Sequence, residues 1–265
     1  MTRRVLMCPP AYFGVEYEIN PWMSRSRQVD NRRAARQWEE LHDLLRGRLG
    51  LSISLLPPRK GLPDLVFTAN AGLVHGDVFL ASNFRHPERQ GEEPVFRRWF
   101  EKEGFRTRTL PADMHFEGEG DFLKVGDRMF AGYRIRSDIR SHEWISKALE
   151  LPVLSLELTD ERFYHLDTCF CPVGSDAAAY FPAAFDSYGR KVIESGITDR
   201  IEVPPEEALR FACNAVIAGR KAVLPAGSGT LKGRLEGMGY EVWETDLSEF
   251  LKAGGAAKCL VLYLD

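Results

Sequence analysis

Residues 71–81 read Ala71-Gly-Leu-Val-His-Gly-Asp-Val-Phe-Leu-Ala81, two short apolar runs joined by a Gly-Asp pair. This pattern predicts two strands and a tight turn, because glycine tolerates the backbone conformation that a hairpin turn needs. Three later stretches repeat the pattern: Asp121-Phe-Leu-Lys-Val-Gly-Asp-Arg-Met-Phe-Ala131, Cys169-Phe-Cys-Pro-Val-Gly-Ser-Asp176 and Asn214-Ala-Val-Ile-Ala-Gly-Arg-Lys-Ala-Val-Leu224. The turn glycines, Gly76, Gly126, Gly174 and Gly219, are 50, 48 and 45 residues apart. The chain therefore carries an internal repeat.

Helical patterns lie between these hairpins, and most are followed by one more apolar strand. The helices are expected near residues 33–49, 92–104, 138–149, 185–194, 204–210 and 229–238, and the strands at Leu51–Leu56, Leu151–Leu156 and Tyr240–Trp243. The chain ends, Arg4–Cys8 and Cys259–Leu264, can pair to complete a fifth unit. We therefore expect a single α/β domain over residues 1–265, a propeller of five repeated units around a central channel. The alternative is an ordinary α/β sandwich.

Length and composition narrow the class of protein. The chain has 265 residues, of which 44% are hydrophobic, enough for one large domain or two small ones. A net charge of −3 argues against a nucleic-acid partner, and no apolar run approaches the length of a membrane span. The short apolar stretch at the start favours a cytoplasmic protein. Five cysteines do not suggest a disulfide framework. The sequence does not determine the oligomeric state, although homo-oligomers are the common case.

Polar residues recur at equivalent places in the repeat. Glu117 and His165 each lie nine residues before their turn glycine, and Asn70 and Cys213 each lie six before theirs. Polar groups that reach one axis from separate repeats indicate a site. Asp167, two residues beyond His165, is expected on the same face of a strand. Each residue also has a purely structural interpretation. Glu117 to Asp121 would form an acidic surface turn, Asn70 would only close a turn, and His165 would be a core histidine. Two thiols spaced as in Cys169-Phe-Cys171 chelate a metal poorly, so no metal is expected.

Cys259 is the most informative cysteine. It follows the Gly-rich stretch Lys252-Ala-Gly-Gly-Ala-Ala-Lys258 and precedes an apolar strand, at a bend where backbone can approach a ligand closely. We expect Lys258 to lower the pKa of this thiol, which would make it a better nucleophile. Cys8, Cys171 and Cys213 lie in apolar strand contexts and are expected to fill space in the core.

These residues resemble those of the guanidino-group-modifying enzymes, which include arginine deiminase, dimethylarginine dimethylaminohydrolase, the amidinotransferases and arginine dihydrolase. The resemblance rests on the order of a Glu, a His and a late Cys, and it spans nearly the whole chain. Four sequence motifs are most similar to those of the arginine dihydrolases: Phe67-Thr-Ala-Asn-Ala-Gly72, Phe116-Glu-Gly-Glu-Gly-Asp121, Phe163-Tyr-His-Leu-Asp-Thr-Cys-Phe-Cys171 and Gly254-Gly-Ala-Ala-Lys-Cys259. The resemblance implies the five-bladed pentein fold.

The resemblance also implies roles for single residues. Cys259 would be the nucleophile, His165 the general acid and base, and Glu117 and Asp167 the carboxylates around the guanidinium. Asn70 stands where deiminases carry an Asp. Substrate carboxylate binding falls to Arg89 and Arg136, with Asn20 nearby. Deiminases usually show Glu-Gly-Gly-Asp, whereas Glu117-Gly-Glu-Gly-Asp121 is one residue longer, so either Glu117 or Glu119 can face the site.

The implied activity is hydrolysis of a small guanidino substrate, arginine or a derivative, without metal or organic cofactor. Asn70 can hydrogen-bond a neutral ureido oxygen, so we expect two hydrolyses that yield ornithine, ammonia and carbon dioxide. Alternatives are a single hydrolysis to citrulline, by a deiminase or dimethylarginine hydrolase, an amidinotransferase, and a non-catalytic pentein that binds a partner.

Overall fold

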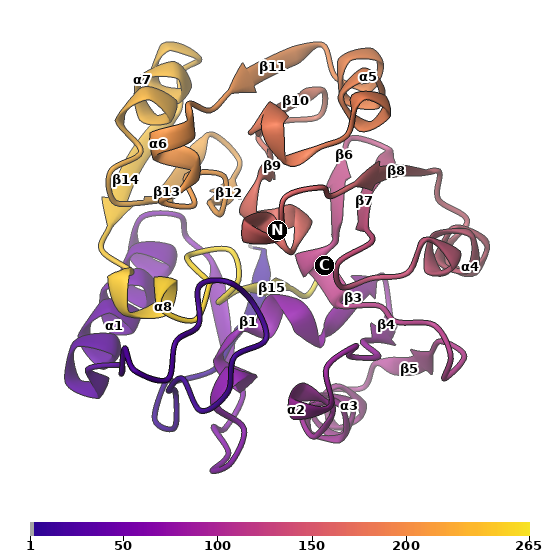
Figure 1. The fold of residues 1–265 in the computed structure, drawn as a ribbon, viewed down its shortest axis with the longest axis vertical. Coiled ribbons are helices and arrows are strands. Elements are labelled where there is room, and N and C mark those ends of the chain that lie inside the picture. Colours follow the sequence, from indigo (N-terminus) through magenta and orange to yellow (C-terminus); the bar gives the residue numbers. More distant parts are fainter. Residues whose placement is uncertain (1–2) are drawn as a thin grey trace.

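The computed structural model describes residues 3–265, and its strands form five sheets of three strands each around a common axis (Figure 1). In every sheet the inner strand pairs antiparallel with the middle strand, which pairs parallel with the outer strand. From inner to outer strand the sheets are β15 (Leu262–Tyr263), β1 (Arg4–Met7) and β2 (Ser52–Leu55); β3 (Gly72–His75), β4 (Val78–Ala81) and β5 (Arg106–Thr109); β6 (Phe122–Val125), β7 (Arg128–Tyr133) and β8 (Val153–Glu157); β9 (Phe170–Pro172), β10 (Ala177–Tyr180) and β11 (Asp199–Glu202); β12 (Val216–Ala218), β13 (Lys221–Pro225) and β14 (Glu241–Thr245). This arrangement confirms the predicted α/β propeller of five units.

The hairpins turn at the repeated glycines. Two residues join β3 to β4, β6 to β7 and β12 to β13, and the first residue of each pair is Gly76, Gly126 or Gly219. These glycines have φ angles of 59°, 61° and 60°, which suit the first central position of a type II′ turn. The fourth hairpin is wider, because β9 ends at Pro172 and the chain needs four residues to reach β10.

The longer helices, α1, α3, α4, α5 and α7, lie on the outer rim of the ring (Figure 1). α1 (Asn31–Gly47) begins at Asp30, whose carboxylate accepts hydrogen bonds from two backbone amides of the first turn. Its apolar stripe, Trp38, Leu41 and Leu45, is buried against the sheets. The other α-helices are α2 (Pro87–Gln90), α3 (Glu93–Lys102), α4 (Ile139–Leu149), α5 (Ser187–Gly196), α6 (Pro205–Ala208), α7 (Gly229–Gly237) and α8 (Ser248–Leu251). The 3₁₀ helices are η1 (Pro63–Val66), η2 (Thr68–Ala71), η3 (Gly118–Gly120), η4 (Glu161–Phe163), η5 (Leu166–Thr168) and η6 (Pro182–Ala184).

The two ends of the chain complete one sheet, since β1 pairs with β15 and both lie near the middle of the ring (Figure 1). Within residues 3–265 no strand ladder joins one sheet to the next. Neighbouring units are linked by two isolated bridges, Asn83 with Phe116 and Leu158 with Phe185. Strand ladders therefore do not close the propeller, and neighbouring units are joined by side-chain packing and by isolated backbone hydrogen bonds such as those between Asn83 and Phe116.

Two local features differ from the sequence expectations. The outer strands β5 and β11 were not predicted, because their sequences Arg-Thr-Arg-Thr and Asp-Arg-Ile-Glu lack an apolar run. The expectation that His165 and Asp167 share a face of a strand is wrong. His165 precedes η5, and Asp167 lies within that 3₁₀ turn, and their side chains contact different partners, Glu117 and Cys259.

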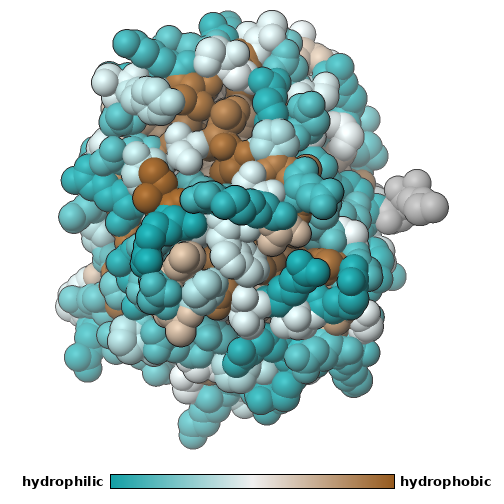
Figure 2. All heavy atoms as spheres, turned by 90° about the vertical axis from the view of Figure 1, so that its right-hand side faces the viewer, coloured by the Kyte–Doolittle hydropathy of each residue, from teal (hydrophilic) through white to brown (hydrophobic). Residues whose placement is uncertain are grey.

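The inner strands of all five sheets line a cavity of about 350 Å³ on the axis. Leu73, Phe122, Phe170, Ala215 and Tyr263 each contribute one side of it, one residue per unit or from the segment that leads into its inner strand. The ring therefore has the central channel expected from the repeat. On the outer face that carries α4, hydrophilic side chains cover most of the surface, with apolar ones gathered in its upper half (Figure 2).

Candidate active site

The segments that precede the inner strands converge at one end of the axis, and they carry the predicted site residues. η2 holds Asn70, Glu117 precedes η3, His165 precedes η5, and Cys259 lies shortly before β15. η3 packs tightly on η2, since a Cβ on Gly118 would lie 2.7 Å from the carbonyl oxygen of Ala69. The nine-residue offset of Glu117 and His165 from their turn glycines thus places both side chains at the axis.

Cys259 lies beside two polar side chains from other units. Asn214 donates from Nδ2 to the Cys259 sulfur at 3.1 Å, and its Oδ1 accepts the Cys259 backbone N–H at 3.1 Å. The Cys259 thiol donates to Asp167 Oδ2 at 3.3 Å. Asn214 also donates to the backbone carbonyl of Asp167 at 3.0 Å. The sulfur is thereby held between an amide donor and a carboxylate acceptor.

The pKa shifts of Cys259 and Asp167 differ from the sequence expectation. Burial raises the pKa of the Cys259 thiol well above its usual value, and the facing Asp167 carboxylate raises it further. Burial also raises the pKa of Asp167 to about 6, although Lys258 acts in the opposite direction. The prediction that Lys258 lowers the pKa of Cys259 is wrong, because its ammonium binds Glu119 at 2.8 Å. The hydrogen bond from Asn214 acts in the opposite direction but does not offset burial and Asp167, so the resting site holds a protonated thiol whose pKa a cationic neighbour would lower.

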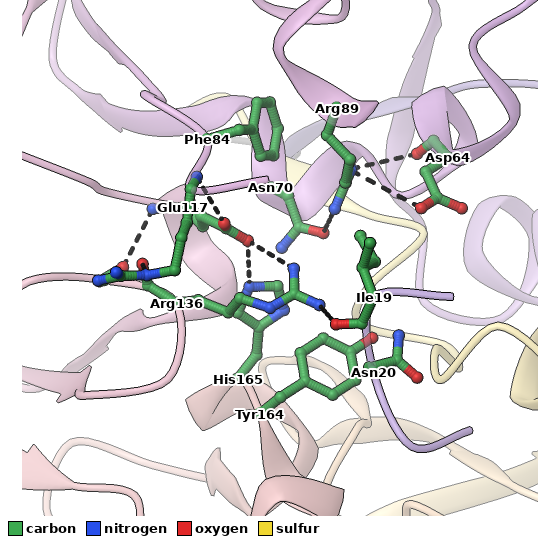
Figure 3. A network of polar contacts seen from close by, with 12 residues as sticks. Ile19, Asn20, Asp64, Asn70, Phe84, Arg89, Glu117, Arg136, Tyr164 and His165 are labelled. Atoms are coloured by element: carbon green, nitrogen blue, oxygen red, sulfur yellow. Dashed lines mark hydrogen bonds and ion pairs between the residues drawn. The ribbon is translucent and has the colours of Figure 1, made fainter. Parts of the chain in front are cut away.

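His165, Glu117 and Arg136 form a second buried group (Figure 3). His165 Nε2 and Glu117 Oε2 are 2.7 Å apart, and Arg136 Nη1 donates to the same oxygen at 3.2 Å. Burial would raise the pKa of Glu117, but Arg136 and His165 outweigh it and hold the pKa below its usual value. Burial lowers the pKa of His165 to about 4, against the opposite effect of Glu117. An ionised carboxylate thus orients a neutral imidazole, whose Nδ1 is buried without a partner among residues 3–265.

A third group surrounds Asn70. Arg89 Nη1 donates to Asn70 Oδ1 at 2.8 Å, while Arg89 Nε and Nη2 donate to the two carboxylate oxygens of Glu92 at 2.9 Å and 2.8 Å. Arg89 Nη2 also donates to the backbone carbonyl of Asp64 at 3.2 Å. Four of the five N–H groups of Arg89 therefore have acceptors, which leaves one for a substrate.

The segment of residues 9–29 reaches the site from the N-terminal end. The carbonyl of Ile19 accepts from Arg136 Nη2 at 2.9 Å, and Tyr17 donates to Asp64 Oδ2 at 3.0 Å. Asn20 lies beside Tyr164 (Figure 3), and its Nδ2 donates to the carbonyl of Ala253 at 3.1 Å. The predicted role of Asn20 in carboxylate binding stays a prediction.

Glu117 and Glu119 point to different places. Glu117 contacts His165 and Arg136, whereas Glu119 pairs with Lys258 and lines the axial cavity. The buried Glu119–Lys258 pair therefore lies on the cavity side, and none of the four predicted catalytic residues lines that cavity. The geometry favours Glu117 as the carboxylate of the site.

Burial distinguishes Arg89 from its neighbour Arg85, and Arg136 from its neighbour Arg134. Arg89 and Arg136 are buried, with relative exposures of 3% and 1%. Arg85 is partly exposed and pairs with Asp138. Arg134 is exposed and pairs with Glu157. Arg89 and Arg136 therefore lie among the buried polar groups of the site, and their role in binding a substrate carboxylate stays a prediction.

A family model described as eukaryotic N,N-dimethylarginine dimethylhydrolase matches residues 10–264. The chain belongs to this family. Within the family it is 49% identical to the bifunctional arginine dihydrolase/ornithine cyclodeaminase AgrE of Nostoc, over 99% of this chain and 38% of that protein. It is 44% identical to the N(G),N(G)-dimethylarginine dimethylaminohydrolase of Mycobacterium tuberculosis, over 98% of this chain and 85% of that protein.

The fold matches that of solved family structures. The N-terminal domain of the cyanobacterial arginine dihydrolase ArgZ, bound to product, has a TM-score of 0.96 and 48% identity, with 100% of this chain and 98% of that chain covered. The same domain has been solved as a cysteine-to-serine variant with substrate and as an asparagine-to-serine variant covalently bonded to a reaction intermediate. The chain spans about two fifths of the length of the bifunctional relatives.

Sequence reasoning missed several residues of this family member's site. Asn214 holds the Cys259 sulfur, yet it was read only as the start of a hairpin strand. Glu92 and Asp64 hold Arg89, but both are acidic residues in ordinary turn or helix-end contexts, so only the folded contacts reveal them. Tyr164, adjacent to His165, stacks under the Arg136 guanidinium at 4.5 Å, and its place beside a candidate histidine was a usable signal.

No helix within residues 3–265 combines the length and the apolar character that a bilayer crossing requires. No set of three or more His, Cys, Asp or Glu side chains in that range is arranged to hold a metal ion.

Proposed function

We propose that this chain hydrolyses the guanidinium group of L-arginine through a covalent intermediate on Cys259, without a cofactor, and yields ornithine, ammonia and carbon dioxide. One observation carries the proposal: the Cys259 thiol with Asp167, the His165–Glu117 pair and the Asn70 amide all lie at one end of the axis. The arginine dihydrolases among the relatives support it. We also propose that residues 1–265 act as one catalytic domain.

The first hydrolysis requires that the site bind the positive charge of the guanidinium. A guanidinium carbon is a weak electrophile because its charge is spread over three nitrogens, so carboxylates must hold and orient the cation. Glu117 and Asp167 supply them. The bound cation offsets the Asp167 carboxylate that raises the pKa of Cys259, and the sulfur then loses its proton more readily. His165 takes up the proton that the sulfur loses, and the thiolate adds to the guanidinium carbon. His165 then transfers that proton to the nitrogen that leaves as ammonia when its bond to the carbon breaks.

The resulting amidino thioether is hydrolysed by water, which gives a proton to His165 as it attacks the same carbon. The carbon–sulfur bond breaks, and the product is neutral citrulline. In the second hydrolysis Cys259 attacks the ureido carbon, a second ammonia leaves, and water releases the carbamic acid of ornithine, which loses carbon dioxide. Two water molecules are consumed per arginine. Asn70 supports this second cycle, because its amide can bind a ureido oxygen.

Arg136 and Arg89 are the groups that we assign to the carboxylate of the substrate. Arg136 approaches the site from the side of Ile19, with its Nε buried and without a partner among residues 3–265. Arg89 has one N–H left after its contacts with Asn70, Glu92 and Asp64. We propose that these two groups bind the carboxylate of the amino-acid substrate.

A product assay tests the proposal. Purified chain is incubated with arginine, methylated arginines, agmatine or citrulline, and ammonia, citrulline and ornithine are measured. Arginine is expected to yield ornithine and two ammonia per molecule consumed. Citrulline as the sole end product would contradict the second hydrolysis.

The second candidate is a single hydrolysis of methylated arginine. The family model and the 44% identical dimethylarginine dimethylaminohydrolase favour it. In the same assay this activity would release dimethylamine from dimethylarginine and leave citrulline unconsumed.

A further inference from the structure

The two ends of the Asn70 side-chain amide have different surroundings. Oδ1 accepts from Arg89 Nη1 at 2.8 Å, whereas Nδ2 is buried and has no acceptor within residues 3–265. An arginine N–H can only donate, so the amide atom that faces Arg89 must be the oxygen. A rotation of the amide by half a turn would place its NH₂ group against the guanidinium. Arg89 therefore determines which end of Asn70 faces the site.

Arg89 itself has little freedom. Glu92 binds it through two parallel hydrogen bonds, and the Asp64 carbonyl takes a further N–H. The relative exposures of Arg89 and Glu92 are 3% and 0%. A bidentate, charge-assisted pair in such a site fixes the plane as well as the position of the guanidinium.

The free amide nitrogen points toward the catalytic imidazole. A Cβ built on Gly120 would lie 2.3 Å from Asn70 Nδ2 and 3.2 Å from His165 Nδ1, so both nitrogens pack against the same glycine. Figure 3 shows the Asn70 nitrogen turned away from Arg89, on the side where His165 and Arg136 lie. The group that Asn70 offers to a substrate is therefore an N–H donor.

We propose that Glu92, acting through Arg89, is a positioning residue that fixes the Asn70 amide as a hydrogen-bond donor and so commits the site to the second hydrolysis. The inference rests on the proposed function. A guanidinium presents only N–H groups and gains nothing from a donor, whereas the ureido group of the first product presents an oxygen that accepts from one. A donor at Asn70 thus favours retention of citrulline for the second attack, and an amide free to turn would lose this preference.

The test is the partition between ornithine and citrulline in a Glu92→Gln variant. Glutamine keeps the shape of Glu92 but can accept only one of the two hydrogen bonds from Arg89. We expect the ornithine-to-citrulline ratio to fall at least about tenfold, the effect of losing one hydrogen bond to a charged group. The kcat/KM for added citrulline should fall at least about tenfold more than that for arginine, because a loosened Arg89 affects the carboxylates of both substrates alike, whereas only citrulline loses the donor at Asn70. Glu207→Gln is the matched control, since Glu207 is also buried but binds two backbone amides at the start of α7.

A double variant separates positioning from general damage. In an Asn70→Asp background the carboxylate has no amide to orient, so Glu92→Gln should leave the product ratio unchanged there. If Glu92→Gln does not fold, Glu92→Asp replaces it, because it keeps the charge and shortens the reach, and an intermediate ratio is expected. An unchanged ratio in either folded variant overturns the inference, as does a drop that persists in the Asn70→Asp background. Wild-type chain that makes no ornithine overturns the proposed function itself, and the inference with it.

Discussion

Replacement of Asp167 by asparagine is expected to stabilise the fold at pH 8 while it abolishes activity. Asp167 is fully buried, and its Oδ1 has no hydrogen-bond donor within residues 3–265. Burial raises its pKa from 3.8 to about 6. As the pH rises through this window the unfolded chain loses the proton first, so ionisation favours unfolding. Above pH 6 the folded protein bears the full cost, about 3 kcal/mol at about 1.4 kcal/mol per pKa unit.

Asparagine removes this cost because it does not ionise. It also loses the acceptor for the Cys259 thiol, which is worth about 1 kcal/mol. The net gain is about 2 kcal/mol at pH 8, or roughly 4 °C in the melting temperature of a chain of this size. Near pH 4 the wild-type carboxyl is protonated in the folded state, and the gain should vanish.

The assay is thermal and urea unfolding of both proteins between pH 4 and pH 8, with arginine hydrolysis measured in parallel. Asp176→Asn is the control, because hydrogen bonds from Thr198 lower the pKa of that exposed carboxyl and its loss brings no gain at pH 8. A variant less stable than wild type at pH 8, or a gain of equal size at pH 4, would refute the reasoning.

Four further substitutions probe the site. Cys259→Ser should fold with an unchanged melting temperature and lose several orders of magnitude in kcat, because a hydroxyl is a far weaker nucleophile; retained turnover would remove Cys259 from the mechanism. Asn70→Asp should shift the product from ornithine toward citrulline, measured by amino-acid analysis, since a carboxylate favours the cationic guanidinium. Glu117→Gln should cost about 3–5 kcal/mol in urea unfolding, because it leaves a buried guanidinium unpaired; a loss under about 1 kcal/mol contradicts this. Gly120→Ala should reduce turnover, since its Cβ would meet the Asn70 amide at 2.3 Å, whereas Gly233→Ala, with nothing within 4 Å, should not.

The repeat was readable from the sequence because its signals are local. A turn glycine, such as Gly76, Gly126 or Gly219, with apolar residues on both sides suffices to specify a hairpin, and the similar spacing of the hairpins indicates the ring. The polar outer strands β5 and β11 were not readable, since the middle strand of each sheet recruits them through backbone pairing rather than through apolar side chains.

The site was partly readable for a similar reason. Their equal offsets from the turn glycines predicted that Glu117 and His165 lie close together. Which way each side chain faces depends on the 3₁₀ turns, whose geometry could not be predicted from the sequence. Lys258 illustrates the limit: it is adjacent to Cys259 in sequence, yet its side chain turns to Glu119 on the cavity side. The orientation of Asn70 depends on Glu92, which the chain brings close only through Arg89.

The most direct test of the central claim is the identity of the residue that carries the substrate during turnover. An Asn70→Ser variant, the kind of substitution with which a relative was solved covalently bonded to its intermediate, is mixed with arginine, quenched within milliseconds and digested for mass spectrometry. We expect the peptide containing Cys259 to gain the mass of arginine less one ammonia, and the peptides of the other four cysteines to stay unmodified. An adduct on any other residue, or turnover that persists without the Cys259 sulfur, would contradict the account.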